Sequence, residues 1–547
     1  MKLIESTFLR ILILLFIFSS GPVFAQEQSS YNSAEESLGK VNFTISCSTD
    51  VQGQFNRGLA LLHNMMYLQA EKEFKEVAKL DPNCAMAYWG TAMTLFHPLW
   101  APPSSEELQR GWEIVQKAIG LKPSSKREMG YINAVTEFYK NWKSVDHSTR
   151  ISAWEKKQEE VFKSNPDDID AGALYALAHI ATAPKGDKTF THQKEAGALL
   201  EKLRIKAPTH PGLFHYTIHA YDNPLLASRA LEVAKGYDKI APEAPHAQHM
   251  PSHIFVRMGM WSLSVDWNKR SAEAAKKQSK PEELSLHYIH AMDYLIYAYL
   301  QKAQDEKAKE ALNTVNKIEK YQDSFASAYG IAAAQTRSFL ELRQWEKAAQ
   351  LKLRTHRTFL WDKYPWFEAI TYFARGLGAA RSNDLDRARD SIKTLDTLYE
   401  RTKKAGQDYW GVLVDSQRKT VAAWIAYSEG KADKALQLMK KAAEIEDSVD
   451  KHPVTPGAVL PARELLGDML VMLGKYDEAI EAYEASLLIS PNRFNSLYGV
   501  GHAAENKGDY NKAKFYYSRL IELTSGVDSD RPILKRATEF LSKQKTK

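Results

Sequence analysis

Histidines are the residues of this chain whose spacing most clearly predicts chemistry. The chain has 16 histidines, and eight of them fall between residues 210 and 290. Two pairs in that stretch are spaced i, i+4: His215 with His219, and His249 with His253, which follow 34 residues later. Residues four apart on a helix lie on one face. Each pair therefore predicts two imidazoles that can bind the same ligand.

Four such imidazoles predict a metal site. Zinc, copper and nickel are commonly bound by neutral imidazole, and side chains of two packed helices can meet because their axes lie about 10 Å apart. One interpretation is therefore a divalent transition metal bound by His215, His219, His249 and His253. Pro251 lies inside the second pair, and a kink there would turn His249 away from His253.

Two other interpretations of the histidines stay open. They can line a metal-free ligand groove, or they can be ordinary hydrogen-bonded core residues. A water on the metal, with a carboxylate such as Asp222 or Asp293 nearby, would permit hydrolysis. The sequence contains no nucleophile motif, no glycine-rich phosphate loop and no HExxH signature. Enzymatic activity therefore stays uncertain, and a binding protein is favoured.

The elements that position these residues follow a 34-residue period, which is clearest near the C-terminus. Five pairs of residues share this offset: Gly467 and Gly501, Gly474 and Gly508, Tyr476 and Tyr510, Ala479 and Ala513, Tyr483 and Tyr517. Such a period is typical of stacked helical hairpins. Gly467 and Ala479 let two helices approach closely, Gly474 allows the turn, and Tyr483 fills the space to the next hairpin.

This pattern resembles the tetratricopeptide repeat (TPR) family, through the final Pro491. The N-terminal part shows equivalent residues: Gly58, Ala70, Phe74 and Pro82. The resemblance implies that four positions of each first helix face a concave groove. Nine residues take such positions by this alignment: His215, His219, Asp222, His246, His249, His253, His290, Asp293 and Tyr297.

Strand signals are almost absent, so the expected fold is all-α, a right-handed TPR superhelix (α-solenoid) of about ten to twelve hairpins. It should cover residues 51–547, with a histidine-rich centre at 210–297. The clearest repeats are 51–84, 460–493 and 494–527. Residues 26–50 are expected to form a partly disordered N-terminal extension.

The N-terminus predicts export. Lys2 and Arg10 precede a short apolar run, and Ala25 ends a typical cleavage site, so residues 1–25 read as a signal peptide. No later stretch is long enough to span a bilayer, and the protein should be periplasmic or secreted. Removing the signal changes the net charge from +6 to +5 without a basic block, which argues against nucleic acid as a partner. Cys47 and Cys84, the only cysteines, form one disulfide or stay as separate buried thiols.

Two functions from different classes follow. The first is an exported TPR scaffold that binds a peptide, a partner protein or an oligosaccharide in its concave groove. An accessory role in bacterial polysaccharide utilisation would suit a resemblance to the exported SusD-like glycan-binding proteins, although Gln26 stands where their lipid-anchor cysteine would be. The second is a metal-binding protein or metal-dependent hydrolase centred on the histidines.

Overall fold

The computed structural model describes residues 37–280, 282–356, 358–527 and 529–545, and the regular elements of these residues are helices. The N-terminal half contains α2 (Gln52–His63), α3 (Tyr67–Leu80), α4 (Ala85–Thr94), α5 (Ser105–Gly120), α6 (Lys126–Tyr139), α7 (His147–Ser164), α8 (Ile169–Ala181), α9 (Thr191–Lys206), α10 (Pro211–Tyr221), α11 (Leu231–Ile240), α12 (Pro245–His249), α13 (Pro251–Arg257) and α14 (Trp261–Gln278). The C-terminal half contains α15 (Leu286–Gln301), α16 (Asp305–Lys317), α17 (Phe325–Leu340), α18 (Trp345–Ala349), α19 (Pro365–Arg381), α20 (Leu385–Lys404), α21 (Asp408–Ser428), α22 (Ala432–Asp447), α23 (Ala462–Met472), α24 (Tyr476–Ile489), α25 (Phe494–Lys507), α26 (Tyr510–Leu523) and α27 (Pro532–Lys545). Three short 3-10 helices accompany them: η1 (Thr49–Val51), η2 (Ala227–Ala230) and η3 (Trp361–Lys363).

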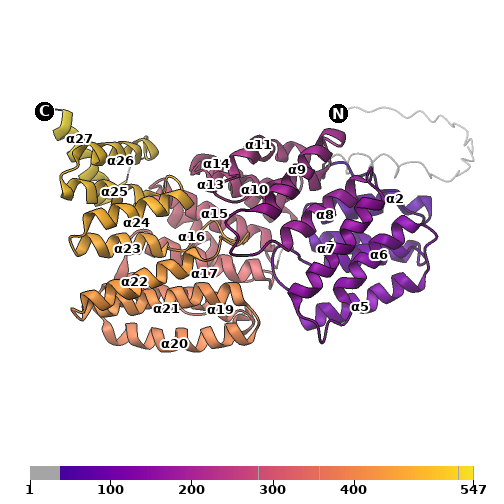
Figure 1. The fold of residues 1–547 in the computed structure, drawn as a ribbon, viewed down its shortest axis with the longest axis horizontal. Coiled ribbons are helices and arrows are strands. Elements are labelled where there is room, and N and C mark those ends of the chain that lie inside the picture. Colours follow the sequence, from indigo (N-terminus) through magenta and orange to yellow (C-terminus); the bar gives the residue numbers. More distant parts are fainter. Residues whose placement is uncertain (1–36, 281, 357, 528, 546–547) are drawn as a thin grey trace, which may run out of the picture.

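Successive helices pack against one another as hairpins (Figure 1). With α12 and α13 taken as one helix interrupted at Met250, α2 to α26 form twelve pairs, from α2 with α3 to α25 with α26, and α27 follows the last pair. No strand forms within the described ranges, where β-type pairing is limited to two isolated bridges. The prediction of an all-α helical-repeat fold is confirmed.

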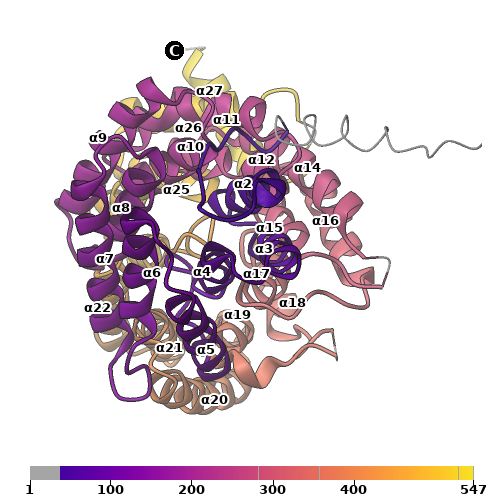
Figure 2. The same cartoon turned by 90° about the vertical axis from the view of Figure 1, so that its right-hand side faces the viewer.

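Figure 2 shows the helices arranged around a common centre, with α10, α15 and α17 on the inner side and α9, α16 and α20 on the outer side. All eleven residues of α10 are buried, and so is α15 from His287 to its end. The outer helix α16 buries only Ala308, Ala311, Leu312 and Val315. Helices that are apolar on all sides belong inside a protein. The inner helices are therefore covered on their concave side as well.

An inner segment, residues 450–461, provides part of this cover. It lies between α22 and α23 in the chain, and most of its residues are buried. Tyr294 donates from its hydroxyl to the Thr455 carbonyl at 2.8 Å. Arg337 donates to the carbonyls of Gly457 and Ala458, each at 2.8 Å. The groove expected on this side is occupied by the chain itself.

The C-terminal repeats also contact the middle of the chain directly. The indole nitrogen of Trp261 donates to the Asn492 carbonyl at 2.8 Å. Arg531 forms an ion pair with Asp305 at 2.6 Å. Residues more than 200 positions apart in the sequence are therefore joined.

The N-terminal residues 37–50 are packed against the helices. Phe43 is fully buried, and Cys47 forms a disulfide with Cys84 across a Cα–Cα distance of 5.0 Å. Ser46 donates from its backbone nitrogen and its hydroxyl to Glu128. The signal peptide expected at 1–25 and the extension up to residue 36 lie outside the described residues. None of the described helices has the length and apolarity that crossing a bilayer requires.

Glycines let the two helices of each C-terminal hairpin approach closely, as the repeat pattern predicts. A Cβ atom on Gly467 would lie 2.7 Å from the Tyr483 ring, and one on Gly501 would lie 2.6 Å from the Tyr517 ring. Side chains at these glycines would overlap those rings. Gly474, in the turn, has a φ of +72°, which favours glycine.

We expect Gly501→Ala to lower the free energy of unfolding by about 1–3 kcal/mol, because the added methyl group overpacks the buried Tyr517 ring. Gly120→Ala is the control, since a Cβ there would have no neighbour within 4 Å. Urea denaturation of both variants measures the difference. Equal stability of the two variants would contradict the packing described here.

Candidate metal centre

Nine buried histidines lie close together where helices α2, α10, α12, α13 and α15 meet. Eight are on these helices, and His210 directly precedes α10. Their exposed fractions run from 0 to 7%: His63, His210, His215, His219, His246, His249, His253, His287 and His290. Helix α10 begins with Pro211, whose fixed φ suits a first helical position. Its remaining residues are mainly apolar, aromatic or histidine, so the whole helix is buried.

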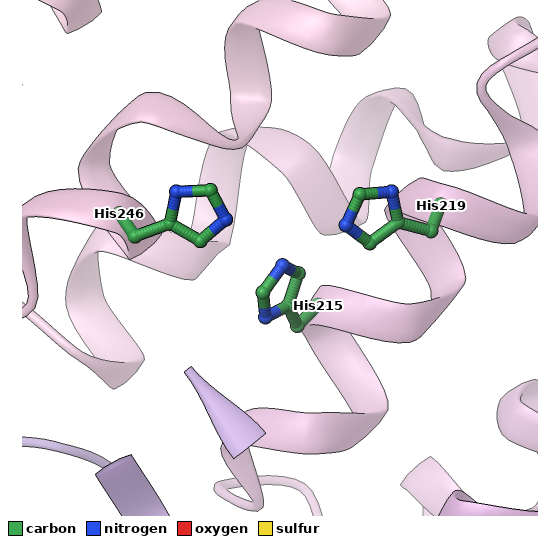
Figure 3. A group of neighbouring side chains, drawn as sticks. All are labelled: His215, His219 and His246. Atoms are coloured by element: carbon green, nitrogen blue, oxygen red, sulfur yellow. The ribbon is translucent and has the colours of Figure 1, made fainter. Parts of the chain in front are cut away.

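Six of these histidines form two clusters made of imidazoles alone, while His63 and His210 share the Asp170 carboxylate. The first cluster is His215, His219 and His246, and the second cluster is His249, His253 and His290. Within each, one ligand atom per residue lies within 4.8 Å of the others. Figure 3 shows the rings of the first cluster around a common space. The clusters touch, because the ring centroids of His219 and His253 are 5.6 Å apart and those of His246 and His249 are 5.8 Å apart.

The predicted set of four metal ligands is thus divided between the clusters. Each i, i+4 pair stays together and takes a third histidine from the residues expected in the groove. The helix is interrupted at Met250, before Pro251, as a kink there would require. Even so, the Nε2 atoms of His249 and His253 are only 3.1 Å apart.

Asn268, on α14, fixes the tautomer of His249. Its amide nitrogen donates to the Ser264 carbonyl at 2.7 Å, so its oxygen must point the other way. That oxygen lies 2.8 Å from Nδ1 of His249. An amide oxygen can only accept a hydrogen bond. His249 therefore carries its proton on Nδ1, and its Nε2 presents a lone pair.

Asp222 fixes the tautomer of His253 in the same way. Its Oδ2 lies 2.8 Å from Nδ1 of His253, so this nitrogen is protonated and, in the neutral ring, Nε2 is not. The two facing Nε2 atoms then hold lone pairs that repel each other unless a cation lies between them. Metal-ligating histidines usually donate their other N–H to a carboxylate or carbonyl in this manner. His290, whose ring centroid is 4.2 Å from that of His249, has a buried Nδ1 without a partner.

The first cluster leaves more nitrogens unpaired. His215 donates from Nδ1 to the His63 carbonyl at 2.7 Å, and its Nε2 is buried without a partner. The Nε2 of His219 and both ring nitrogens of His246 are also buried without partners. Buried polar atoms are nearly always hydrogen-bonded. So many unpaired nitrogens in one place are unusual for a purely structural core.

Burial keeps these imidazoles neutral. Desolvation lowers the pKa of His215 to about 3 and that of His249 to about 4. It also lowers the pKa values of His219, His246 and His253. Neutral imidazole is the form that binds a metal ion.

Asp222 also belongs to an ion-pair network. It accepts from Nε of Arg257 at 2.9 Å and from Nζ of Lys451 at 2.6 Å. Arg257 in turn pairs with Asp450 at 2.9 Å. Asp450 and Lys451 belong to the inner segment, which therefore lies directly beside the second cluster.

The structure does not bring Asp293 and Tyr297 into either cluster. Asp293 accepts from Nε of Arg337 at 3.1 Å, and burial raises its pKa to about 6. The Tyr297 hydroxyl accepts from Arg493 at 3.0 Å. Both residues face the inside, but their partners are the arginines that join the C-terminal part of the chain to α15.

Several residues of the centre have no signal in the sequence. Asn268 belongs to no motif that would mark it as a partner of His249. Lys451 forms its ion pair with Asp222, which lies 229 residues earlier in the chain. Trp100 has its ring centroid 5.5 Å from that of His246 and also comes from a distant loop. The spacing of the histidines alone could not have identified them.

The tetratricopeptide repeat family model matches residues 460–493 and 494–526. These are the two C-terminal repeats that the sequence predicted most clearly. The model does not extend to the repeat expected at 51–84, although α2 and α3 form a hairpin there. No curated protein matches the chain in sequence.

The solved structures to which the chain is similar include the APC/C hetero-tetramer Cut9-Hcn1. The match has 11% sequence identity and a TM-score of 0.31, and it covers 90% of this chain and 89% of that chain. The human IFIT1 dimer with PPP-AAAA matches at 14% identity and a TM-score of 0.39, covering 90% and 99%. We draw no conclusion about this chain from likenesses of this size.

Acid should destabilise the metal-free protein. The pKa values of His215, His249 and His287 are lowered to about 3 or 4 in the folded chain, against about 6.5 unfolded, so the unfolded chain binds more protons below pH 6.5. The stability these groups contribute is present above pH 6.5 and falls as the pH drops toward 4. We expect each of these three histidines to lower the free energy of unfolding by about 2 kcal/mol when the pH falls from 7.5 to 5.

Urea denaturation in the presence of a chelator measures this loss. His287→Gln is the matched variant, because the amide cannot take up a proton and the variant should lose about 2 kcal/mol less over the same range. Equal stability of the wild type at pH 7.5 and pH 5 would show that these rings are not buried as neutral groups.

Proposed function

We propose that this protein binds transition-metal ions at its two buried histidine clusters, and that the helical repeats form the scaffold around them. The observation that carries the proposal is the pair of Nε2 atoms of His249 and His253, which face each other at 3.1 Å. Asn268 and Asp222 hold the opposite nitrogens. A cation between the two lone pairs would turn a repulsive contact into two bonds.

The distance between these atoms suits a metal. With metal–nitrogen bonds of about 2.0–2.1 Å, two nitrogens 3.1 Å apart enclose an angle of about 100° at the ion. That angle is close to the tetrahedral value that zinc adopts in proteins. His290 supplies a third imidazole. Copper and nickel also bind imidazole, so the ligand set by itself fits all three metals.

Burial supports an ion-sized ligand. The six histidines of the clusters are at most 7% exposed, and the Trp100 ring and the inner segment cover them. A polymer or a peptide would have to displace these parts of the chain to reach the imidazoles. Holding or carrying a metal ion is therefore better supported than hydrolysis of a large substrate.

The repeats alone predict a scaffold that binds a peptide, a partner protein or an oligosaccharide, with a role in polysaccharide utilisation as one version of it. We do not place such a ligand at the histidines, because residues 450–461 occupy the inner side there. The surfaces of the repeats at 460–526 stay suited to a partner protein.

We also propose that the protein works outside the cytoplasm, in the periplasm or as a secreted protein. The N-terminal signal pattern supports this location, and so does the disulfide between Cys47 and Cys84, because such bonds persist mainly in oxidising compartments.

Metal analysis of the purified protein tests the proposed function. After incubation with copper, zinc or nickel and gel filtration, we expect retained metal and a raised melting temperature, since an ion that binds only the folded state stabilises it by about 4 kcal/mol at 1,000 times Kd. His253→Ala should lose the ion of the second cluster. His502→Ala, which changes a histidine of α25 far along the chain, is the control and should keep it.

Metal-free wild-type protein after this treatment would contradict the proposal. Equal metal contents of His253→Ala and wild type would instead place the ion elsewhere. Circular dichroism of each variant establishes that the fold is retained.

A further inference from the structure

The second cluster has no negative charge of its own. Its three ligands are imidazoles, which burial keeps neutral, and the charged groups beside it are already paired with one another. Asp222 faces both Arg257 and Lys451, while Asp450 faces Arg257. Two carboxylates thus balance two cations. The positive charge of a bound ion would be offset by no further carboxylate of this network.

A further carboxylate is that of Asp293, one turn along α15 from His290. It is paired with the buried guanidinium of Arg337 at 3.1 Å, with both side chains 0% exposed. Arg337 is fixed in turn by the Gly457 and Ala458 carbonyls and by the Tyr329 hydroxyl, which accept its other hydrogen bonds. Moving Asp293 to a metal would leave this arginine without its counter-ion.

An uncompensated ion in a buried site costs free energy that rises with the square of its charge, because the solvation lost on burial follows that square. A dication therefore costs about four times as much as a monovalent ion of similar size. The geometry of the site does not discriminate between zinc(II) and copper(I) to a comparable degree. Zinc(II) and copper(I) both have filled d shells and impose no geometry of their own.

Lys451 increases the difference between the cost of binding a dication and that of binding a monovalent ion. Its ammonium group lies 2.6 Å from Oδ2 of Asp222, the same oxygen that accepts from Nδ1 of His253 at 2.8 Å. The ammonium is therefore separated from a ligand ring by a single oxygen atom. It is buried, with 8% of its side chain exposed, so solvent screens its charge poorly. Its repulsion of a dication is twice its repulsion of a monovalent ion.

We propose that the second cluster selects its metal by charge and binds copper(I) in preference to divalent ions such as zinc(II). This inference rests on the proposed function, since it names the ion class for the same site. Lys451 acts as a specificity-determining residue without being a ligand. Asp222 links it to the site by holding both Lys451 and His253.

The test compares how one substitution changes the binding of two ions. The full mature chain is titrated without oxygen, with copper(I) against a chromophoric copper(I) chelator and with zinc(II) against a zinc chelator. We expect the wild type to retain copper(I) and to lose zinc(II) to its chelator. Lys451→Gln removes the charge and keeps a hydrogen-bond donor for Asp222. It should raise zinc(II) affinity at least tenfold more than copper(I) affinity.

Lys440→Gln is the matched control, because it removes an equal charge from the exposed ion pair with Glu478 and should change neither affinity. If Lys451→Gln does not fold, Lys451→Met removes the same charge with a side chain suited to burial. Equal changes for both ions, or a wild type that holds zinc(II) against its chelator, would overturn the charge selection and leave metal binding intact. A wild type that binds neither ion would overturn the proposed function as well.

Discussion

The centre of this protein depends on one constraint: imidazoles that are removed from water need partners, and here the chain does not supply enough of them. Asn268, Asp222 and the His63 carbonyl accept hydrogen bonds from His249, His253 and His215, in each case from the nitrogen facing away from a cluster. The Nε2 atoms of those three rings therefore present lone pairs to the clusters, and both ring nitrogens of His246 are buried without partners. A core built only for stability would have replaced such groups with apolar side chains, because buried polar atoms without partners are costly.

The repeats make this arrangement possible by burying the inner helices on all sides. In an open superhelix the first helices of the hairpins face solvent, and histidines on them would be hydrated and titrate normally. Here α10 and α15 are covered, and the inner segment contributes the charges that hold Asp222 in place. The scaffold and the site are thus connected: the residues that close the superhelix also surround the ligands.

The local pattern predicted much of the fold, and less of the site. The 34-residue offset correctly predicts a close approach of two helices at Gly467 and a Tyr483 ring that reaches the next hairpin, where a Cβ on Gly499 would lie 2.4 Å from it. It also brings His215 and His219 beside the helix that carries His249 and His253. It could not show that His246 completes one cluster and His290 the other, because side-chain direction decides this. Asp293 and Tyr297 have groove positions by the same alignment, yet Arg337 and Arg493 bind them. Arg337 comes from α17 in the neighbouring hairpin and Arg493 from a repeat near the C-terminus, and the 34-residue pattern does not show that either side chain reaches these positions.

The contacts between distant repeats have a mechanical consequence. A solenoid whose repeats touch only their neighbours lengthens like a spring, because each repeat can rotate slightly. Here Trp261 is tied to Asn492, Asp305 to Arg531 and Arg257 to Asp450. These ties join the turns of the coil to one another. Pulled from its two ends, the protein would resist extension as a rigid body and then give way abruptly, when the ties across the turns break together.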